Sequence, residues 1–271
     1  MGGKATGRYC EGGREMDYDA TAIPEAYPRA RALPARVMRL WQRAVRRAAP
    51  LRPGSTVVDA GCGAGRFSVA LASGYANRVI GLDRSARMLA QTRSRHARVS
   101  FCVADVQQLP IRQSSVSMVF LSNVVHHLSD LQGAAAGFAR VLERPGFVVV
   151  RNYVRERLAS VPYLEFFPEA HAASLAMLPS AGEVVAAFER AGLKLVSAEM
   201  IEQPVASSPG EYLSKVRSRV YSDLATISDD AFEAGVTRMA DAVSSGWRRA
   251  LCEPISLFAF APDYPSRPTS K

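Results

Sequence analysis

Five short apolar runs rich in β-branched residues recur between residues 56 and 152, and they constrain the fold more than any other feature. The runs are TVVDA, RVIGLD, VSFCVAD, VSMVFLS and GFVVVRN. Segments with helical spacing of apolar residues separate them, around 65–75, 85–95 and 131–143. Strands that alternate with helices indicate a parallel sheet covered on both faces. Right-handed crossovers then favour a doubly wound α/β fold.

The rest of the chain continues with further helices and two more strands. SAGEVVAAFERAGLKLVSAEMIE is typical of a serine-capped helix, about 181–190, followed by a strand at roughly 193–202. Two helical patterns occupy 209–250, and PISLFAFA has the composition of a final strand. No internal repeat or linker divides the chain, so we expect a single domain over 34–271 after an N-terminal arm, 1–33.

The composition is that of an ordinary globular protein, with 48% hydrophobic and 22% charged residues. No uninterrupted run of about 18 apolar residues predicts a membrane span, and the first residues lack the apolar core of a secretory signal. The four cysteines lie far apart without a CxxC pair. That pattern argues against a zinc site and favours a reducing compartment, so we expect a cytoplasmic protein without a bound metal.

The net charge is +9, and eight arginines lie between Arg29 and Arg52. A basic face of this kind can attract RNA or an anionic lipid surface. A solvated helix face has the same composition. Charge alone therefore leaves both interpretations open.

A glycine turn, Gly61-Cys62-Gly63-Ala64-Gly65, follows the first apolar run and opens the first helical segment. Nucleotides bind at such turns in open α/β sheets, because glycine lets the backbone pass close to a ligand and free amides at the helix start can bond to it. The spacing is G-x-G-x-G, and Asp59 precedes the first glycine by two residues. This pattern differs from the G-x-G-x-x-G fingerprint of dinucleotide sites.

Acidic residues end the first three apolar runs. Asp83 lies about 20 residues beyond the glycine turn, where a carboxylate can accept hydrogen bonds from both hydroxyls of a ribose. Asp105 ends the third run, where a carboxylate can accept the exocyclic amine of an adenine. Any one of these acids could instead be a turn former or a helix cap. Together with Asp59 they indicate one nucleoside-binding crevice at the strand ends.

These segments resemble the class I S-adenosylmethionine-dependent methyltransferases, within the broad family that includes ubiquinone/menaquinone-type enzymes. VVDAGCGAGRFS resembles the first motif of that family, VIGLDRSARML its ribose-binding acid, VADVQQLPI its adenine-binding segment and SMVFLSNVVHHL its fourth motif. The resemblance covers residues 57–152 well. It implies a Rossmann-like sheet of seven strands with helices on both faces, a helical cap and one antiparallel strand, for which PISLFAFA is well placed.

The resemblance implies S-adenosylmethionine as cofactor and S-adenosylhomocysteine as product. The glycine turn would line the methionine part, Asp83 would hold the ribose, and Asp105 would meet the adenine edge. Residues 18–31 resemble the N-terminal segment that closes over the cofactor, and an arginine there would suit the methionine carboxylate. The predicted cofactor-binding set is Tyr18, Tyr27, Arg31, Asp59, Gly61, Cys62, Gly63, Asp83, Arg84, Met88, Asp105, Val106 and Asn123.

His126 and His127 follow the fourth run, near the expected position of the transferred methyl group. A histidine there could remove a proton from the acceptor. Paired histidines also belong to the fourth motif of the family, and methyl transfer can proceed by alignment alone. We therefore keep both roles, base and positioning, for these two residues. No third ligand at helical spacing suggests a metal site.

The acceptor pocket is expected from segments that the family does not share, around 153–180 and 205–250, which could form a helical cap. Aromatic and polar residues in the first of these segments are its candidate lining. They are Tyr153, Tyr163, Glu165, Phe166 and His171.

The sequence thus predicts methyl transfer to an O, N or C atom of a small molecule, in specialised metabolism. A quinone-type C-methyltransferase is a close alternative. Two further alternatives remain. One is an RNA methyltransferase that uses the basic N-terminal face, and the other is a non-catalytic cofactor-binding protein. The chain has no appended RNA-binding module, so nucleic acid is not the favoured partner. Either a monomer or a homodimer is compatible with the sequence.

Overall fold

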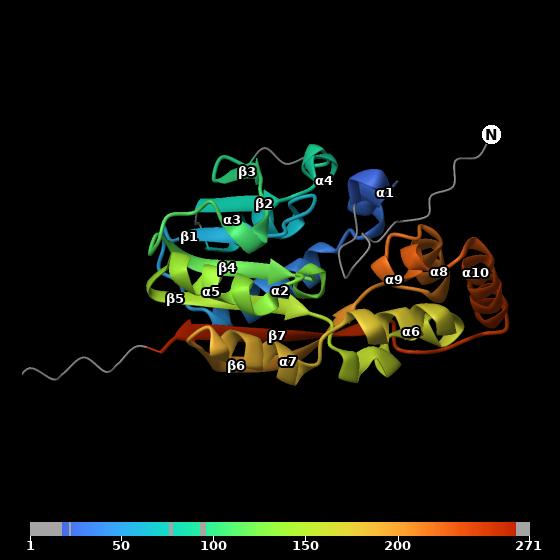
Figure 1. Ribbon diagram of the computed structural model, residues 1–271. Helices are drawn as coiled ribbons and strands as arrows, with labels where there is room; N and C mark the ends of the chain where they lie inside the picture. The colour runs from blue at the N-terminus through green and yellow to red at the C-terminus, as the bar shows by residue number, and fades with distance from the viewer. Residues whose placement is uncertain (1–17, 22, 76–77, 93–95, 264–271) are drawn as a thin grey trace, which may run out of the picture.

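The computed structural model describes residues 18–21, 23–75, 78–92 and 96–263, and it contains the expected doubly wound α/β sheet (Figure 1). Seven strands lie in the order β3-β2-β1-β4-β5-β7-β6. β7 is antiparallel to both of its neighbours, and the first five strands pair in parallel. The predicted fold class is confirmed. The strands are β1 (Thr56–Ala60), β2 (Arg78–Asp83), β3 (Val99–Val103), β4 (Val116–Ser122), β5 (Leu142–Asn152), β6 (Leu193–Pro204) and β7 (Cys252–Pro262).

Helices cover the two faces of the sheet and one end of it (Figure 1). α2 and α3 share a buried cluster with one face, and α5 and α7 share another cluster with the opposite face. The helices are α1 (Ile23–Ala30), α2 (Ala35–Ala48), α3 (Arg66–Tyr75), α4 (Ala86–Ala90), α5 (Leu131–Val141), α6 (Pro168–Met177), α7 (Ala181–Arg190), α8 (Pro209–Arg217), α9 (Ser222–Thr226) and α10 (Asp229–Ser244).

The predicted serine cap of α7 is present and forms a full capping box. Ser180 Oγ accepts the Glu183 N–H at 3.0 Å, and Glu183 Oε2 accepts the Ser180 N–H at 2.7 Å. Phe188 of this helix is fully buried and stacks on Phe260 of β7, with ring centroids 4.5 Å apart. Phe138 of α5 lies on its other side at 6.3 Å. Three stacked rings therefore join two helices to the sheet.

One helix is shorter than its pattern predicts. Of the segment around 85–95, the described residues up to 92 form helix only from Ala86 to Ala90. Ser85 starts the helix by accepting the Met88 N–H at 3.0 Å. At the other end, the Gln91 N–H bonds back to the Met88 carbonyl at 3.1 Å in a tight closing turn.

A second hydrophobic core lies beyond the end of the sheet. α6, α8, α9 and α10 pack around it together with the short turns η4 (Arg155–Ser160) and η5 (Pro162–Phe166). These helices come from the two segments that were expected to form a cap. Figure 1 shows them gathered past the carboxyl ends of β4 and β5. We call this group the cap.

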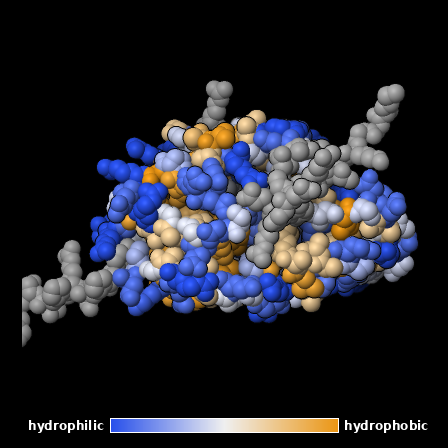
Figure 2. Space-filling model, viewed as in Figure 1, coloured by the Kyte–Doolittle hydropathy of each residue, from blue (hydrophilic) through white to orange (hydrophobic). Residues whose placement is uncertain are grey.

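The arginines of α2 lie on its solvent side. Arg36, Arg39, Arg43 and Arg46 are exposed, whereas Trp41 is buried against the sheet. In the described part of the chain, no helix is long and apolar enough to cross a membrane. Hydrophilic side chains occupy much of the face seen in Figure 2.

Replacing Phe188 with alanine should lower the free energy of unfolding by about 3–5 kcal/mol, because a large cavity would open between α5, α7 and β7. Urea denaturation followed by circular dichroism measures this change. Glu189→Ala, at an exposed position one residue on, is the matched control and should change stability by less than about 0.5 kcal/mol. Equal effects of the two substitutions would contradict the packing described here.

Candidate functional site

The turn between β1 and α3 holds its glycines in backbone conformations that other residues rarely adopt. The φ angle is +72° at Gly61 and +54° at Gly63. A Cβ added to Gly61 would lie 2.5 Å from Cγ2 of Val124, which follows β4. The turn therefore packs directly on the end of the neighbouring strand, and no larger residue fits at position 61.

A cavity of about 720 Å³ lies above this turn, at the carboxyl ends of the strands. We call it the first cavity. Ten of the predicted cofactor residues line it, namely Tyr18, Tyr27, Gly61, Gly63, Asp83, Arg84, Met88, Asp105, Val106 and Asn123. Five residues that were not assigned to the cofactor complete the lining, namely Gln107, Ser122, Val124, His127 and Leu128.

The carboxylate of Asp83 connects the glycine turn to α4. Its Oδ2 accepts the Gly63 N–H at 2.7 Å, and its Oδ1 accepts the Ser85 N–H at 2.9 Å. Burial raises the pKa of Asp83 above its usual value, although both backbone bonds act in the opposite direction. Asp105 plays a similar local part, since its Oδ1 accepts the Gln107 N–H at 2.8 Å. Both acids lie where the strand pattern placed them.

Asp59 and Cys62 do not line this cavity. Asp59 is buried and accepts the hydroxyl of Ser68 at 2.6 Å, and burial raises its pKa to about 7. The Cys62 sulfur lies 3.0 Å from the position that a Cβ on Gly81 would take, and burial raises the pKa of this thiol. Asp59 and Cys62 therefore contact the protein interior next to the turn: Asp59 bonds to Ser68 of α3, and Cys62 packs on Gly81 of β2.

The N-terminal arm is latched onto α4, so far as residues 18–33 are described; residues 1–17 lie outside the described part. Arg87 donates to the carbonyl oxygens of Asp19 and Thr21 and forms an ion pair with Glu25 of α1 at 2.7 Å. Ser85 donates to the Asp19 carboxylate. These contacts hold the arm over the edge of the first cavity, where Tyr18 and Tyr27 contribute to the wall.

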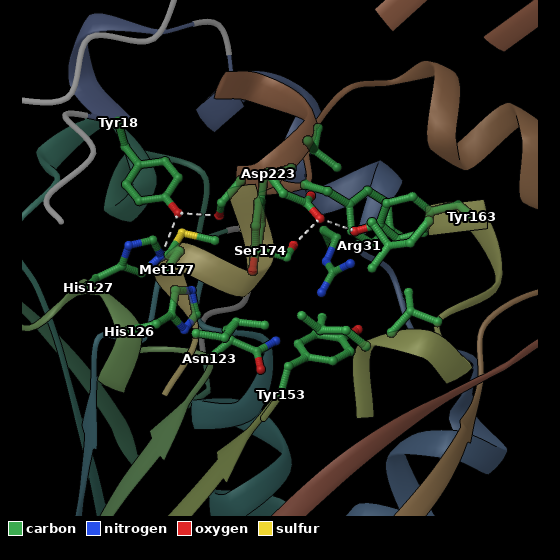
Figure 3. Close-up of a pocket in the computed structure, with 18 residues that line it drawn as sticks. Tyr18, Arg31, Asn123, His126, His127, Tyr153, Tyr163, Ser174, Met177 and Asp223 are labelled. Atoms are coloured by element: carbon green, nitrogen blue, oxygen red, sulfur yellow. Dashed lines mark hydrogen bonds between the residues drawn. The ribbon is translucent and has the colours of Figure 1, made fainter. Parts of the chain in front are cut away.

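A second cavity, about 600 Å³, lies between the cap and the strand ends (Figure 3). Its cap side combines apolar residues such as Leu158, Leu164 and Met177 with the polar residues Ser174 and Asp223. Arg31, which was predicted to bind the cofactor, lines this cavity and is absent from the lining of the first one.

Four side chains line both cavities: Tyr18, Tyr27, Asn123 and His127. Asn123 has a φ of +56° at the end of β4, and its buried Oδ1 has no hydrogen-bond partner among the described residues. His127 Nε2 lies 3.0 Å from the Tyr18 hydroxyl, while its buried Nδ1 is also without a partner there. Unpaired buried polar atoms cost about 1–3 kcal/mol each. Their position between the cavities is consistent with ligand contacts.

His126 is held as a neutral imidazole in one tautomer. The Asn152 amide nitrogen donates to the Tyr153 carbonyl at 2.7 Å, so its Oδ1 is the atom 3.3 Å from His126 Nδ1. Because Oδ1 can only accept, Nδ1 carries the proton and Nε2 keeps a free lone pair. Burial lowers the pKa of His126 to about 4 and that of His127 well below its usual value.

The predicted acceptor residues divide into two groups. Tyr153 and Tyr163 line the second cavity. Glu165, Phe166 and His171 do not: Glu165 accepts the Trp247 indole N–H at 2.6 Å and pairs with Arg249, and Phe166 packs on the Trp247 ring. His171 lies on α6 outside the lining of this cavity.

Some residues of the second cavity were not predicted. Asp223 and Ser174 are buried, and the Asp223 Oδ2 accepts the hydroxyls of Tyr163 and Ser174, both at 2.7 Å. They lie on α9 and α6, which meet only through packing of the cap, and no short sequence pattern marks them. Among the described residues, no group of three possible metal ligands comes together.

Comparison with known proteins identifies the central part of the chain. Residues 58–150 match the family model of a methyltransferase domain. The malonyl-[acyl-carrier protein] O-methyltransferase of Serratia marcescens is 38% identical over 98 residues, which are 36% of this chain and 38% of that enzyme. A probable S-adenosylmethionine-dependent methyltransferase of Mycolicibacterium smegmatis is 28% identical over 211 residues, which are 72% of this chain and 78% of that protein.

The fold has a close counterpart among solved structures. A crystal structure from Anabaena variabilis, assigned as a methyltransferase of an antibiotic biosynthesis pathway, has a TM-score of 0.71 and 21% identity. The match covers 81% of this chain and 96% of that one, and it concerns the fold. This chain spans 36% to 53% of the length of the malonyl-[acyl-carrier protein] O-methyltransferases that it resembles.

The tautomer of His126 can be checked by nitrogen-15 NMR of the imidazole rings. We expect a neutral ring with the proton on Nδ1 down to about pH 5, one unit above its pKa of about 4. Asn152→Leu removes the acceptor and should leave a mixture of tautomers. A doubly protonated His126 ring at neutral pH in the unaltered protein would contradict the buried, neutral state.

Proposed function

Because the chain carries a methyltransferase domain of the class I, S-adenosylmethionine-dependent kind, we propose that it transfers the methyl group of this cofactor to a small molecule held under the cap. The observation that carries the proposal is the shared wall of the two cavities. Tyr18, Tyr27, Asn123 and His127 line both of them. A donor in one cavity and an acceptor in the other would therefore meet at these four side chains.

The residues of the first cavity fit the cofactor. The glycine turn offers bare backbone where a Cβ at position 61 would clash. Asp83 offers a carboxylate for the ribose hydroxyls, and Met88 and Val106 offer apolar surface for the adenine. The Oδ1 of Asn123 has no hydrogen-bond partner among the described residues and lies at the boundary between the cavities. As an acceptor it suits the ammonium group of the methionine part.

When bound, S-adenosylmethionine supplies an electrophilic methyl group on a sulfonium ion. The chain's own contribution is to align the acceptor with that group and to exclude water. Tyr18 and His127 are fixed to each other at 3.0 Å, so this part of the wall is preformed. For His126 and His127 we propose positioning. Burial lowers the pKa of His126 to about 4 and that of His127 well below its usual value, and such weak bases remove a proton from a hydroxyl or amine poorly.

The lining of the second cavity favours a small molecule over RNA. Cap residues such as Leu164 and Met177 give part of it an apolar wall. The exposed arginines of α2 line neither cavity. A role in specialised metabolism is part of the proposal, supported by the fold shared with a protein assigned to antibiotic biosynthesis. The Serratia relative acts, by its name, on an oxygen atom, which makes O-transfer a candidate here.

Incubation with cofactor labelled in the methyl group and a panel of small acids, phenols, amines and quinones tests the proposal directly. Label should appear in at least one extracted product. Gly61→Val, which places a side chain against Val124 in the turn, should abolish that transfer. Binding of S-adenosylhomocysteine with no transfer to any class of acceptor would favour a non-catalytic role.

Asp83→Asn should weaken binding of S-adenosylhomocysteine about 10- to 100-fold, because charge-assisted hydrogen bonds contribute about 1.5–3 kcal/mol. Calorimetry with the purified variant measures the change. Asp241→Asn, at an exposed position on α10, is the matched control and should bind as the unaltered protein does. Unchanged affinity in Asp83→Asn would show that the ribose site has been assigned wrongly.

A further inference from the structure

Arg31 is a cation that no described carboxylate pairs with, although it lies in a cavity wall. No acidic oxygen in the described part of the chain lies within 4.0 Å of its side-chain nitrogens. The guanidinium lies 4.4 Å from the centre of the Tyr221 ring. In Figure 3 it points into the open space of the second cavity. Hydrogen bonds to Tyr27 and Tyr221 use part of the five N–H donors of this guanidinium, and the others are available for a ligand.

The buried carboxylates near Arg31 are already occupied. Asp223 accepts two hydroxyls through Oδ2, and its Oδ1 accepts the Leu224 N–H at 2.8 Å. Glu253 is fully buried and accepts the hydroxyls of Tyr153, Tyr212 and Tyr221. Neither of these two carboxylates forms an ion pair with Arg31.

Guanidinium groups at this wall lower the pKa of one phenol, that of Tyr27. Burial raises the pKa of Tyr27, but Arg66, Arg31 and Arg151 outweigh that effect and lower it below its usual value. Tyr163, deeper under the cap, shows the opposite: burial and Asp223 raise its pKa. Tyr221 and Tyr153 also lie near Arg31, but burial and Glu253 raise the pKa of both phenols. The readier ionisation is therefore confined to the position of Tyr27.

Arg31 lies close to the wall that the two cavities share, because it interacts with Tyr27. The Tyr27 side chain lines both cavities and interacts with the guanidinium of Arg31. A group held by Arg31 therefore lies next to the shared wall. The same cavity also offers aliphatic surface from Leu158, Val161 and Leu178.

We infer that the acceptor is an organic acid with an apolar body, whose carboxylate or phenolate oxygen is held by Arg31 and receives the methyl group. This inference rests on the proposed methyltransferase function and deepens it. The apolar body lies against the cap, and the anionic oxygen lies beside Tyr27. No protein base is required, because the nucleophile arrives without its proton.

The transfer balances without a further reactant. The acceptor oxygen forms the bond to the methyl carbon, the sulfur–carbon bond breaks, and its electron pair stays on sulfur. The anion and the sulfonium become a neutral methyl ester or ether and a neutral thioether.

The test compares matched acidic and neutral probes on the protein saturated with S-adenosylhomocysteine. Biphenylcarboxylate and its primary amide form one pair, and hydroxybiphenyl and its methyl ether form the other. By calorimetry, at least one acid should bind about tenfold more tightly than its neutral partner. Arg31→Gln should abolish this difference, and Arg31→Lys should retain most of it. Arg29→Gln, exposed on α1, is the matched control and should leave it unchanged.

A second measurement separates this inference from the cofactor assignment. Arg31→Gln should bind S-adenosylhomocysteine within about twofold of the unaltered protein. If it instead weakens that binding tenfold or more, Arg31 serves the cofactor carboxylate and the inference is overturned. Acids that bind no better than their neutral partners also overturn it. Failure of the unaltered protein to bind S-adenosylhomocysteine would refute the proposed function itself.

Labelled cofactor distinguishes the two kinds of acid. Label that is released by mild base shows a methyl ester and a carboxylate acceptor, whereas base-stable label on hydroxybiphenyl shows an ether and a phenolate acceptor. Label found only on amines or on carbon acceptors would contradict the inference while leaving the methyltransferase function intact.

Discussion

A single buried carboxylate ties the cap to the sheet. Glu253 of β7 is fully buried, and the three hydroxyls that it accepts come from the end of β5, from α8 and from the segment before α9. A buried charge is costly unless hydrogen bonds satisfy it, so these three tyrosines have to remain around it. Because β7 runs antiparallel to β5, its first residues lie at the carboxyl end of the parallel strands. The reversed strand thereby fixes the cap over the site.

The sheet and most of the first cavity could be predicted from sequence because both depend on local patterns. Apolar runs, a glycine turn and acids at strand ends are all visible within a few residues, and parallel pairing brings the strand ends together. Asp83, Asp105 and Gly63 therefore lie where their spacing implied. Asp59 is different, because it lies within β1 and before the end of that strand, where its carboxylate accepts the buried hydroxyl of Ser68 on α3.

The second cavity could not be predicted in the same way. Its wall draws on the N-terminal arm, the turn after β4 and three parts of the cap, which are adjacent only in the folded chain. The sequence predicts aromatic residues of the segment 153–180 as the lining of this cavity. Tertiary packing decides which of them face inward: Tyr163 turns toward Asp223, and Glu165, two residues on, turns toward Trp247 at the surface. Arg31 reaches the same cavity from the opposite end of the chain.

The two tyrosines of the N-terminal arm couple the two cavities to each other. Tyr18 and Tyr27 belong to the walls of both cavities, and the arm is held on α4 by exposed contacts of Arg87. The Tyr18–His127 contact and the buried side chain of Ile23 hold the arm in the same position. Any opening that admits one ligand also removes part of the wall around the other. The position of the arm therefore shapes both cavities at once.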